Sequence, residues 1–326
     1  LALNAQAVVM EVSSHGLDQG RVNGVEFDVA VLTNLSRDHL DYHGSMEAYA
    51  QAKQKLFSWP SLKCAVINAD DAFGQRLLTT LKAESKATLS YGFSDEADVR
   101  GSHLRLHEAG LSMQVTYQQK SVELQAPILG RFNAYNTLAV LSALLAMDVS
   151  LEQALPAIAQ LQSVPGRMQQ CGGGKLPLVV VDYAHTPDAL EKVLMTLREQ
   201  APGQLICLFG CGGERDTGKR PLMGSVAAAL ADQIIVTSDN PRSESPDAII
   251  AEVLQGMNGA VYQVQPDRAQ AIKLAILSAQ PGDIVLLAGK GHETYQEVAG
   301  VKQPFDDVEQ ARLALGQYRM TQGVPA

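Results

Sequence analysis

The chain has 326 residues, a length typical of two domains that each bury a hydrophobic core. Its 26 Lys and Arg are outnumbered by 35 Asp and Glu, and the net charge of -9 excludes a general cationic surface for nucleic acid or anionic membrane. Any anionic ligand must therefore be held by local Arg or Lys side chains or by backbone amides.

No apolar run approaches the roughly 18 residues that a membrane-spanning helix needs, so we expect a soluble chain without membrane insertion. The cysteines show no CxxC spacing, which favours reduced thiols and a cytoplasmic location; they are Cys64, Cys171, Cys207 and Cys211. The sequence opens LALNAQAVVMEVSSHG, without a starting Met or a basic region, and we interpret it as a fragment.

In the first half, apolar runs alternate with helical patterns, which is typical of a mostly parallel sheet. The predicted strands are Ala7–Val12, Phe27–Thr33 and Cys64–Asn68, and the predicted helices are Ser45–Phe57 and Ala72–Leu81. Residues 98–128 then alternate apolar and polar positions between turn residues, which predicts an antiparallel addition to the sheet. Helices are predicted next at 133–147 and 151–161, with Asn133 as an N-cap.

The Pro- and Gly-rich stretch Pro165–Lys175 predicts a connection, so we expect domains at 1–168 and 169–326. In the second, strands at 178–182, 205–209, 233–237 and 283–288 alternate with helices at 187–200, 221–231, 246–257, 268–279 and 306–318. This is typical of a Rossmann-like, doubly wound α/β domain, whose ligands bind beyond the carboxyl ends of the strands. The polar clusters DYAHTPD, GCGGERDTGKR, SDNPRSE and GKGHETY follow four strands and should face one crevice.

The stretch GGERDTGKR nearly spells a phosphate-binding loop. Gly213, Gly218 and Lys219 fit GxxxxGK, but Arg220 stands where a magnesium-binding Ser or Thr is required. The alternatives are a glycine-rich loop that holds an anion with Arg215 and Arg220, and a solvated basic turn.

The stretch NLSRDHLDYHG groups Asp38, His39, Asp41 and His43 after a predicted strand, and Glu11 ends the neighbouring one. These side chains suit a divalent cation, although each alone is more often a capping or surface group. Pattern alone gives Lys53 as an exposed helix lysine and Asn136 as an ordinary first-turn residue.

The stretch DNPR follows a strand and presents a carboxylate, an amide and a guanidinium on a backbone that Pro241 stiffens. Arg242 could grip a carboxylate while Asp239 accepts from an ammonium, with Glu293 as a second acceptor, so the set suits a zwitterion. The alternative is a helix-entry turn with a surface ion pair.

Several segments occur together in one order: EVSSHGLDQGR, TNLSRDHLDYHG, EAYAQAK, GRFNAYNTLAV, VPGRMQ, VDYAHTPDAL, GCGGERDTGKRPLM, DNPR and GKGHETYQ. In these segments the chain resembles the Mur ligase family over essentially its whole length, and in particular the members that add meso-diaminopimelate. The resemblance implies an ATP-dependent amide-bond ligase of peptidoglycan biosynthesis that uses Mg²⁺. ATP would phosphorylate the side-chain carboxyl of D-Glu in UDP-MurNAc-L-Ala-D-Glu, and an amine of meso-diaminopimelate would attack the acyl phosphate.

The resemblance also implies roles for single residues. The catalytic magnesium site would comprise Glu11, His39 and a carbamylated Lys53. The UDP-MurNAc-dipeptide would be held by Ser13, Gln19 and Arg21, and ATP by Asn136, Arg167, Asp182 and His185. Diaminopimelate would be held by Arg215, Asp239, Asn240, Pro241, Arg242, Gly289 and Glu293. An unpaired Arg242 facing lysine in place of diaminopimelate would be costly, which would give discrimination.

The family's GTxGKT-like phosphate loop, which precedes EVSS, and its N-terminal domain are absent here, so we expect this chain alone to be inactive as a ligase. We expect a monomer that binds only small molecules. The alternatives are a lysine-adding Mur ligase, a folylpolyglutamate synthetase-like ligase, an oxidoreductase, which lacks GxGxxG, and a non-catalytic amino-acid-binding fragment.

Overall fold

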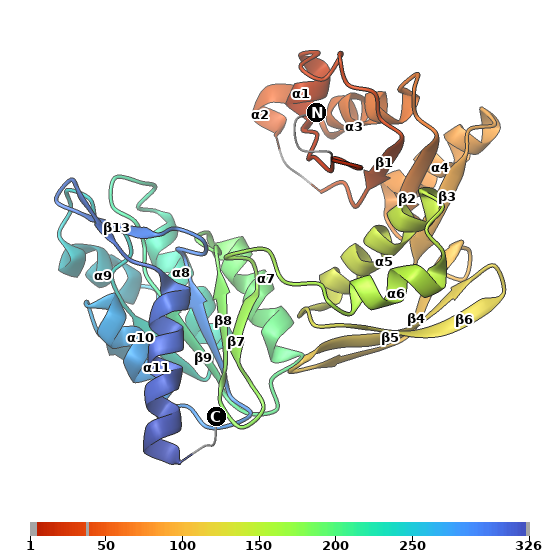
Figure 1. Cartoon of the computed structure of the whole chain (residues 1–326). Helices are drawn as coiled ribbons and strands as arrows, with labels where there is room; N and C mark the ends of the chain where they lie inside the picture. Colours follow the sequence, from red (N-terminus) through yellow and green to blue (C-terminus); the bar gives the residue numbers. More distant parts are fainter. Residues whose placement is uncertain (1–4, 37–38, 324–326) are drawn as a thin grey trace. The chain divides into compact units, whose positions relative to one another are not determined.

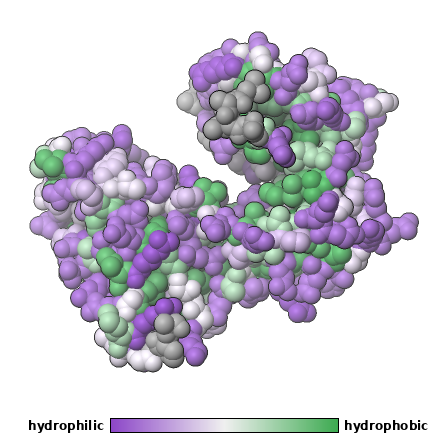
Figure 2. Space-filling model, in the orientation of Figure 1, coloured by the Kyte–Doolittle hydropathy of each residue, from purple (hydrophilic) through white to green (hydrophobic). Residues whose placement is uncertain are grey.

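The computed structural model describes residues 5–36 and 39–323, which form two compact units (Figure 1). Unit 1 comprises Leu1–Leu104, Ser112–Gln125 and Phe132–Ala159, and unit 2 comprises Arg105–Leu111, Ala126–Arg131 and Gln160–Ala326. No helix in this part of the chain is long and apolar enough to cross a membrane. Hydrophilic residues cover most of the face shown in Figure 2, and apolar residues occupy smaller areas of it.

Unit 1 is built on a six-stranded sheet with the order β1-β2-β3-β4-β5-β6. The strands are β1 (Val29–Leu32), β2 (Cys64–Asn68), β3 (Thr88–Gly92), β4 (Val99–His107), β5 (Gly110–Tyr117) and β6 (Lys120–Ala126). The first four pair in parallel, whereas two-residue connections join β4 to β5 and β5 to β6, and connections that short join antiparallel strands. The predicted parallel sheet with an antiparallel addition is confirmed.

Unit 1 also contains six α-helices and one 3₁₀ helix in its described part. They are α1 (Ser14–Asp18), α2 (Leu40–His43), α3 (Met46–Gln54), the 3₁₀ helix η1 (Lys55–Ser58), α4 (Ala72–Ala83), α5 (Arg131–Ala146) and α6 (Leu151–Ile158). Because α5 already begins at Arg131, the prediction of Asn133 as an N-cap is wrong, and Asn133 lies in the first turn.

The predicted strand Ala7–Val12 is also wrong. These residues form no strand, and Val9 is 95% exposed. A strand needs a neighbour for its backbone hydrogen bonds, and in the described part of the chain the edge strand β1 pairs only with β2. Apolar composition alone therefore misled the prediction.

Unit 2 has a sheet with the order β11-β10-β9-β12-β8-β7, in which only β7 is antiparallel. The strands are β7 (Gln169–Gly172), β8 (Leu178–Asp182), β9 (Leu205–Phe209), β10 (Gln233–Val236), β11 (Tyr262–Val264) and β12 (Ile284–Ala288). The helices are α7 (Pro187–Arg198), α8 (Lys219–Leu230), α9 (Pro246–Leu254), α10 (Arg268–Ser278) and α11 (Asp307–Gln322). A separate hairpin pairs β13 (Tyr295–Val298) with β14 (Val301–Pro304).

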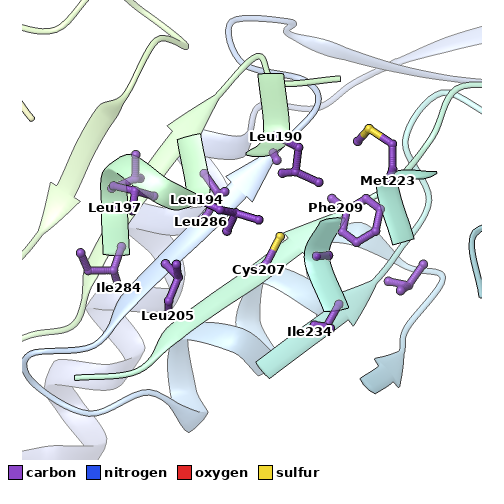
Figure 3. Packing of buried hydrophobic residues seen from close by; sticks show 14 of the residues in the cluster. Leu190, Leu194, Leu197, Leu205, Cys207, Phe209, Met223, Ile234, Ile284 and Leu286 are labelled. Atoms are coloured by element: carbon purple, nitrogen blue, oxygen red, sulfur yellow. The ribbon is translucent and has the colours of Figure 1, made fainter. Parts of the chain in front are cut away.

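The period-2 alternation of strand side chains divides the core of unit 2 into two layers. On β9, Cys207 packs with the layer under α7, α8 and α9, whereas Leu208 packs with the layer under α10 and α11. Figure 3 shows the first layer, in which Leu190 and Leu194 of α7 lie over Leu286 and Cys207 of the sheet. Helices on both faces make this the doubly wound domain that the sequence predicts.

Capping residues fix where several helices of unit 2 begin. They therefore also fix where the loops that precede these helices end. The Thr186 side chain accepts a hydrogen bond from Ala189 N at 3.3 Å at the start of α7. Asp267 caps α10 and Asp306 caps α11 in the same way. Such side chains satisfy amides that have no partner within the helix.

Sequence reasoning missed β3 in unit 1, and it missed β7, β11 and the β13–β14 hairpin in unit 2. The predicted connection Pro165–Lys175 contains β7, which pairs with β8 through its backbone. Its sequence, QQCG, carries no strand pattern, because pairing with an existing sheet edge requires only backbone groups.

Asp70 links the end of β3 to α5 in unit 1. Its carboxylate accepts hydrogen bonds from Phe93 N at 2.6 Å, Ser94 N at 3.1 Å and the Tyr135 hydroxyl at 2.9 Å. Burial raises the pKa of Asp70, but these hydrogen bonds outweigh burial and bring the pKa below its ordinary value. The ionised form of Asp70 therefore stabilises the fold.

Replacing Asp70 by Asn removes that charge, and we expect it to lower the free energy of unfolding by about 2 kcal/mol at pH 7. A lowered folded-state pKa stabilises above the unfolded pKa, and the gain is lost as pH falls through the folded pKa. The difference between wild type and Asp70→Asn should thus shrink below about pH 4, as measured by urea unfolding at several pH values. The exposed Asp95→Asn is the control, and an equal effect from it would contradict this role.

Candidate active site

The polar loops of unit 2 follow four neighbouring parallel strands. Strands β10, β9, β12 and β8 lie side by side in that order and pair in parallel. The carboxyl ends of parallel strands meet at one edge of the sheet, where ligands bind in open α/β sheets. The predicted convergence of the four polar clusters is therefore confirmed.

Asp239 is a buried carboxylate in the loop after β10. Its Oδ1 accepts a hydrogen bond from Asn240 N at 2.6 Å. Burial raises the pKa of Asp239, and the charges of Arg268 and Lys290 oppose that rise. Gly289 leaves space beside the carboxylate, because a Cβ at this position, with φ +114°, would lie 2.7 Å from Asp239 Oδ2.

Arg268 and Asp307 form a fully buried ion pair beneath this loop. Arg268 Nε lies 2.8 Å from Asp307 Oδ1, and Arg268 Nη2 lies 2.7 Å from Asp307 Oδ2. Arg268 Nη2 also donates to Ala288 O at 3.0 Å, next to Gly289. The pair joins α10 and α11 to the end of β12, and it directs the hydrogen bonds of Arg268 to Asp307 rather than to Asp239.

Asn240 connects the loop after β10 to the loop after β12. Its Nδ2 donates to Glu293 Oε2 at 2.8 Å, and its Oδ1 accepts from Lys290 Nζ at 3.1 Å and from Glu297 N at 3.0 Å. Lys290 is fully buried and also donates to Glu293 Oε2 at 3.3 Å. The structure thus brings together four predicted residues, namely Asp239, Asn240, Gly289 and Glu293.

Arg242 has a left-handed backbone, with φ 53°, that the β13–β14 hairpin holds in place. Its N–H donates to Glu297 O at 3.1 Å, and its carbonyl accepts from Ala299 N at 2.7 Å. The Arg242 side chain is 19% exposed; Nη1 donates to Gly213 O at 2.5 Å, and Nε lies 3.7 Å from Glu297 Oε2. The premise that Arg242 would be unpaired when it faces lysine is therefore wrong, because Gly213 O and Glu297 already pair with part of the guanidinium.

Arg215 lies next to Arg242 over Gly212. A Cβ on Gly212 would be 3.1 Å from Arg242 Nη1 and 3.8 Å from Arg215 Cγ. Arg220 is different, because it is fully buried and its guanidinium pairs with Glu244 at 2.9 Å and with Glu252 at 3.0 Å. The interpretation of Arg220 as an anion-holding residue is wrong. Residues 214–218 of the same loop are exposed, so anion binding by Arg215 and a solvated turn both remain alternatives there.

Sequence reasoning missed several residues of this cluster. Lys290 stands inside GKGH between two predicted residues, so its position in the motif was a usable signal. Glu297 belongs to the unpredicted hairpin. Arg268 and Asp307 begin two helices 39 residues apart, and only tertiary packing pairs them.

Gly213 allows the loops after β9 and β10 to touch. Its N–H donates to Asn240 O at 2.9 Å, and a Cβ would lie 2.0 Å from Pro241 O. Gly213→Ala must therefore separate the two loops, and we expect it to destabilise unit 2 by about 2 kcal/mol and to displace Pro241 and Arg242.

The control for Gly213→Ala is Gly316→Ala, since Gly316 lies in α11 with open space around its Cβ position. There Ala should stabilise by up to about 1 kcal/mol because it favours helix. Thermal unfolding of both variants tests this, and equal melting temperatures for the two would contradict the close approach of the loops.

Three of the four residues predicted around ATP lie together in unit 2. Asp182 Oδ2 accepts from Met168 N at 2.9 Å and its Oδ1 from Ala184 N at 2.8 Å, while burial raises its pKa. Arg167 stands over the Tyr183 ring, 5.0 Å from the centroid. His185 Nδ1 lies 2.9 Å from Tyr183 O, and because a carbonyl only accepts, Nδ1 carries the hydrogen and Nε2 is left as an acceptor.

Asn136, the fourth of these residues, belongs to unit 1. It is exposed in the first turns of α5, where its Nδ2 donates to Asn133 Oδ1 at 2.9 Å.

The three residues predicted for the UDP-MurNAc-dipeptide surround α1. Ser13 is its N-cap and accepts from Gly16 N at 3.0 Å. Gln19 is its C-cap and donates to the Tyr42 hydroxyl at 3.2 Å, and the Arg21 side chain is exposed just beyond. The structure therefore presents all three on one short segment.

Two of the three predicted magnesium ligands, His39 and Lys53, lie near a group of aromatic rings in unit 1. The His39 ring lies 5.8 Å from the Tyr49 ring, and Lys53 Nζ lies 5.1 Å from the centroid of the same ring. His15, which sequence reasoning missed, lies 4.8 Å from His39. Glu11 is exposed in the segment before α1.

The donor set suits a divalent cation, because carbamylation would turn Lys53 into a second carboxylate beside Glu11 and His39. Within residues 5–36 and 39–323, no three His, Cys, Asp or Glu side chains are grouped closely enough to hold a metal ion. A carbamylated lysine is not one of those residue types, so this set remains a prediction. Asp38 and the side chain of Asp41 lie outside the described part of the chain.

Two family models match the chain in succession. Residues 1–144 match the Mur ligase middle domain, and residues 166–291 match the Mur ligase glutamate ligase domain. The chain belongs to the Mur ligase family. Both units therefore match Mur ligase domains. The doubly wound unit matches a ligase domain, which disfavours the oxidoreductase alternative.

The curated relatives of this Mur ligase chain include UDP-N-acetylmuramoyl-L-alanyl-D-glutamate–2,6-diaminopimelate ligases. The protein from Chromobacterium violaceum is 55% identical over 95% of this chain and 63% of its own length. The protein from Pseudomonas aeruginosa is 54% identical over 97% of this chain and 65% of its own length. The chain thus spans less than two thirds of the length of these relatives.

Solved structures give the same relationship. A UDP-N-acetylmuramoyl-L-alanyl-D-glutamate–2,6-diaminopimelate ligase structure superposes with a TM-score of 0.76 at 45% identity, covering 94% of this chain and 63% of that chain. A UDP-N-acetylmuramate-alanine ligase from Thermotoga maritima has a TM-score of 0.63 at 19% identity, covering 90% or more of this chain and 61% of its own, so that likeness concerns the fold alone.

Proposed function

We propose that this chain is the metal-binding and amino-acid-binding part of an ATP-dependent ligase. The ligase would join meso-diaminopimelate to the D-Glu of UDP-MurNAc-L-Ala-D-Glu in peptidoglycan biosynthesis. The printed activity of relatives that are 54–55% identical supports this proposal, as does the chemistry of the loops beyond β9, β10 and β12.

One observation carries the choice of amino acid. Cationic and anionic side chains meet in these loops, with Arg215 and Arg242 at Gly212, and with the buried Asp239 and the half-buried Glu293 both hydrogen-bonded to Asn240. Meso-diaminopimelate carries a carboxylate and an ammonium at each end. Arg242 would bind the distal carboxylate, Asp239 and Glu293 the distal ammonium, and Arg215 the carboxylate at the reacting end.

The reaction that the family resemblance implies has two steps, a phosphoryl transfer from ATP and an attack by the amine of diaminopimelate. The γ-phosphoryl group of ATP would pass to an oxygen of the D-Glu side-chain carboxylate, releasing ADP. The amine of diaminopimelate would then bond to the acyl carbon and expel phosphate, losing a proton. Arg167, with a guanidinium that stays charged, would stabilise phosphate charge, and His185 Nε2 would offer an acceptor to the nucleotide.

Glu11, His39 and a carbamylated Lys53 would hold Mg²⁺. Such an ion, when bound, neutralises charge on phosphate oxygens. Lys53 must lose its positive charge to take part, and carbamylation achieves that by converting the amine to a carboxylate. Ser13, Gln19 and Arg21 on either end of α1 would hold the UDP-linked dipeptide.

Within the family, a lysine-adding ligase fits these loops less well. L-Lysine has no distal carboxylate, so the remaining donors of Arg242 would face an ammonium or water. A folylpolyglutamate synthase from Thermotoga maritima shares the fold at a TM-score of 0.62, but only at 16% identity.

We further propose a cytoplasmic monomer with small-molecule partners and a domain boundary at 168/169. All four cysteines are free thiols, and burial raises the pKa of Cys207 to about 12 and of Cys211 to about 11. Thiols of this kind stay protonated, and four unpaired cysteines are compatible with a reducing compartment.

ATP turnover tests the proposed activity. A protein of the relatives' full length that carries this sequence should release ADP and phosphate only when UDP-MurNAc-L-Ala-D-Glu and meso-diaminopimelate are both present. NAD binding without such turnover would instead favour the oxidoreductase interpretation.

Arg242→Ala tests the choice of amino acid. The variant should lose one charged contact to the distal carboxylate, so the preference for meso-diaminopimelate over L-lysine should fall by about 100-fold. Calorimetric titration of this chain with each amino acid measures the preference. Arg198→Ala, which removes an exposed ion pair with Asp232, is the control, and an unchanged preference in Arg242→Ala would refute the assignment.

A further inference from the structure

Asn240 occupies a position where three groups decide how its side-chain amide is oriented. Lys290 Nζ lies 3.1 Å from one amide atom and Glu297 N lies 3.0 Å from the same atom. Glu293 Oε2 lies 2.8 Å from the other. Asn240 and Lys290 are both buried, so water does not substitute for these partners.

The chemistry of the three partners alone decides which atom of the Asn240 amide is the oxygen and which is the nitrogen. An ammonium and a backbone N–H only donate, so the amide atom facing Lys290 and Glu297 must be the acceptor Oδ1. A carboxylate only accepts, so the atom facing Glu293 must be the donor Nδ2. All three contacts agree on one orientation.

This orientation limits what Asn240 can offer to a ligand. The two lone pairs of Oδ1 are used by Lys290 and Glu297, and one Nδ2 hydrogen is used by Glu293. The remaining capacity is the second Nδ2 hydrogen. Asn240 can therefore only donate, which suits a ligand carboxylate and disfavours an ammonium.

We infer that Lys290 is a positioning residue for amino-acid selectivity. Its buried ammonium holds the amide of Asn240 with the donor side available, so that Asn240 assists Arg242 in reading a carboxylate. Without Lys290, Glu297 N and Glu293 Oε2 would still favour the same orientation, but the amide would lose its charged donor and would rotate more often to present Oδ1. This inference rests on the proposed function, because it names how the same site selects its amino acid.

The test compares this chain with its Lys290→Met variant, which keeps side-chain length but removes every donor. Titration calorimetry gives the dissociation constant of L-lysine divided by that of meso-diaminopimelate, which measures the preference for meso-diaminopimelate. We expect Lys290→Met to lower this ratio by about tenfold. A general structural defect would weaken both ligands alike and leave the ratio unchanged.

Lys302→Met is the matched control. Lys302 Nζ lies 4.2 Å from the Tyr295 ring centroid and Lys290 Nζ lies 5.7 Å from the same centroid, but Lys302 is exposed. Both variants thus remove a lysine beside one ring, and only one touches Asn240. Lys302→Met should keep the wild-type ratio within about twofold, and an equal loss in both variants would overturn the inference.

A measurement on the wild type does not depend on the variant folding. In ¹⁵N-labelled chain, the Nδ2 proton of Asn240 that binds Glu293 should exchange slowly with water, and meso-diaminopimelate should shift the other Nδ2 proton more than L-lysine does. Rapid exchange of both protons before any ligand is added would overturn the inference. If wild type fails to bind meso-diaminopimelate while the proton that binds Glu293 is protected, the proposed function fails and the orientation of Asn240 stands.

Discussion

The parallel pairing of β8, β9, β10 and β12 is the constraint from which the rest of unit 2 follows. Parallel strands deliver their connecting loops to one edge, and four consecutive loops cannot occupy that edge without close contact. Gly213 and Gly289 provide the space, the first between two backbones and the second beside a carboxylate. The result is a compact region in which side chains from separate parts of the sequence share hydrogen bonds, and in which the position of each depends on the others.

Charge is distributed unevenly in that region. Arg268 is matched by Asp307, and Lys290 is shared by Glu293 and Asn240. Asp239 is buried, and its carboxylate forms no salt bridge with a cation in the described part of the chain. Burying such a carboxylate is unfavourable unless a partner arrives, and a ligand ammonium is such a partner. The same imbalance that lowers the stability of the free site therefore favours a bound cation.

The sequence predicted the elements whose signal is local. Strands such as Leu205–Phe209 are continuous apolar runs between turn residues, and their observed bounds match the prediction. Elements that depend on a neighbouring strand were predicted wrongly. Ala7–Val12 is apolar but pairs with no strand, whereas β7 is polar and was missed although it pairs with β8. At the site, family motifs located Asp239 and Arg242, whereas the roles of Lys290 and Glu297 emerged only from distances between loops.

The main chain of the loop from Asp239 to Arg242 is anchored at several points. Gly213 N donates to Asn240 O, Gln296 Nε2 donates to Asp239 O, and both backbone groups of Arg242 pair with the β13–β14 hairpin. These main-chain hydrogen bonds do not depend on which side chains residues 239–242 carry. Over evolutionary time, exchanges of one or two residues here could redirect a ligase to a different building block while the surrounding architecture stayed intact, which would let cell-wall chemistry diversify on a single scaffold.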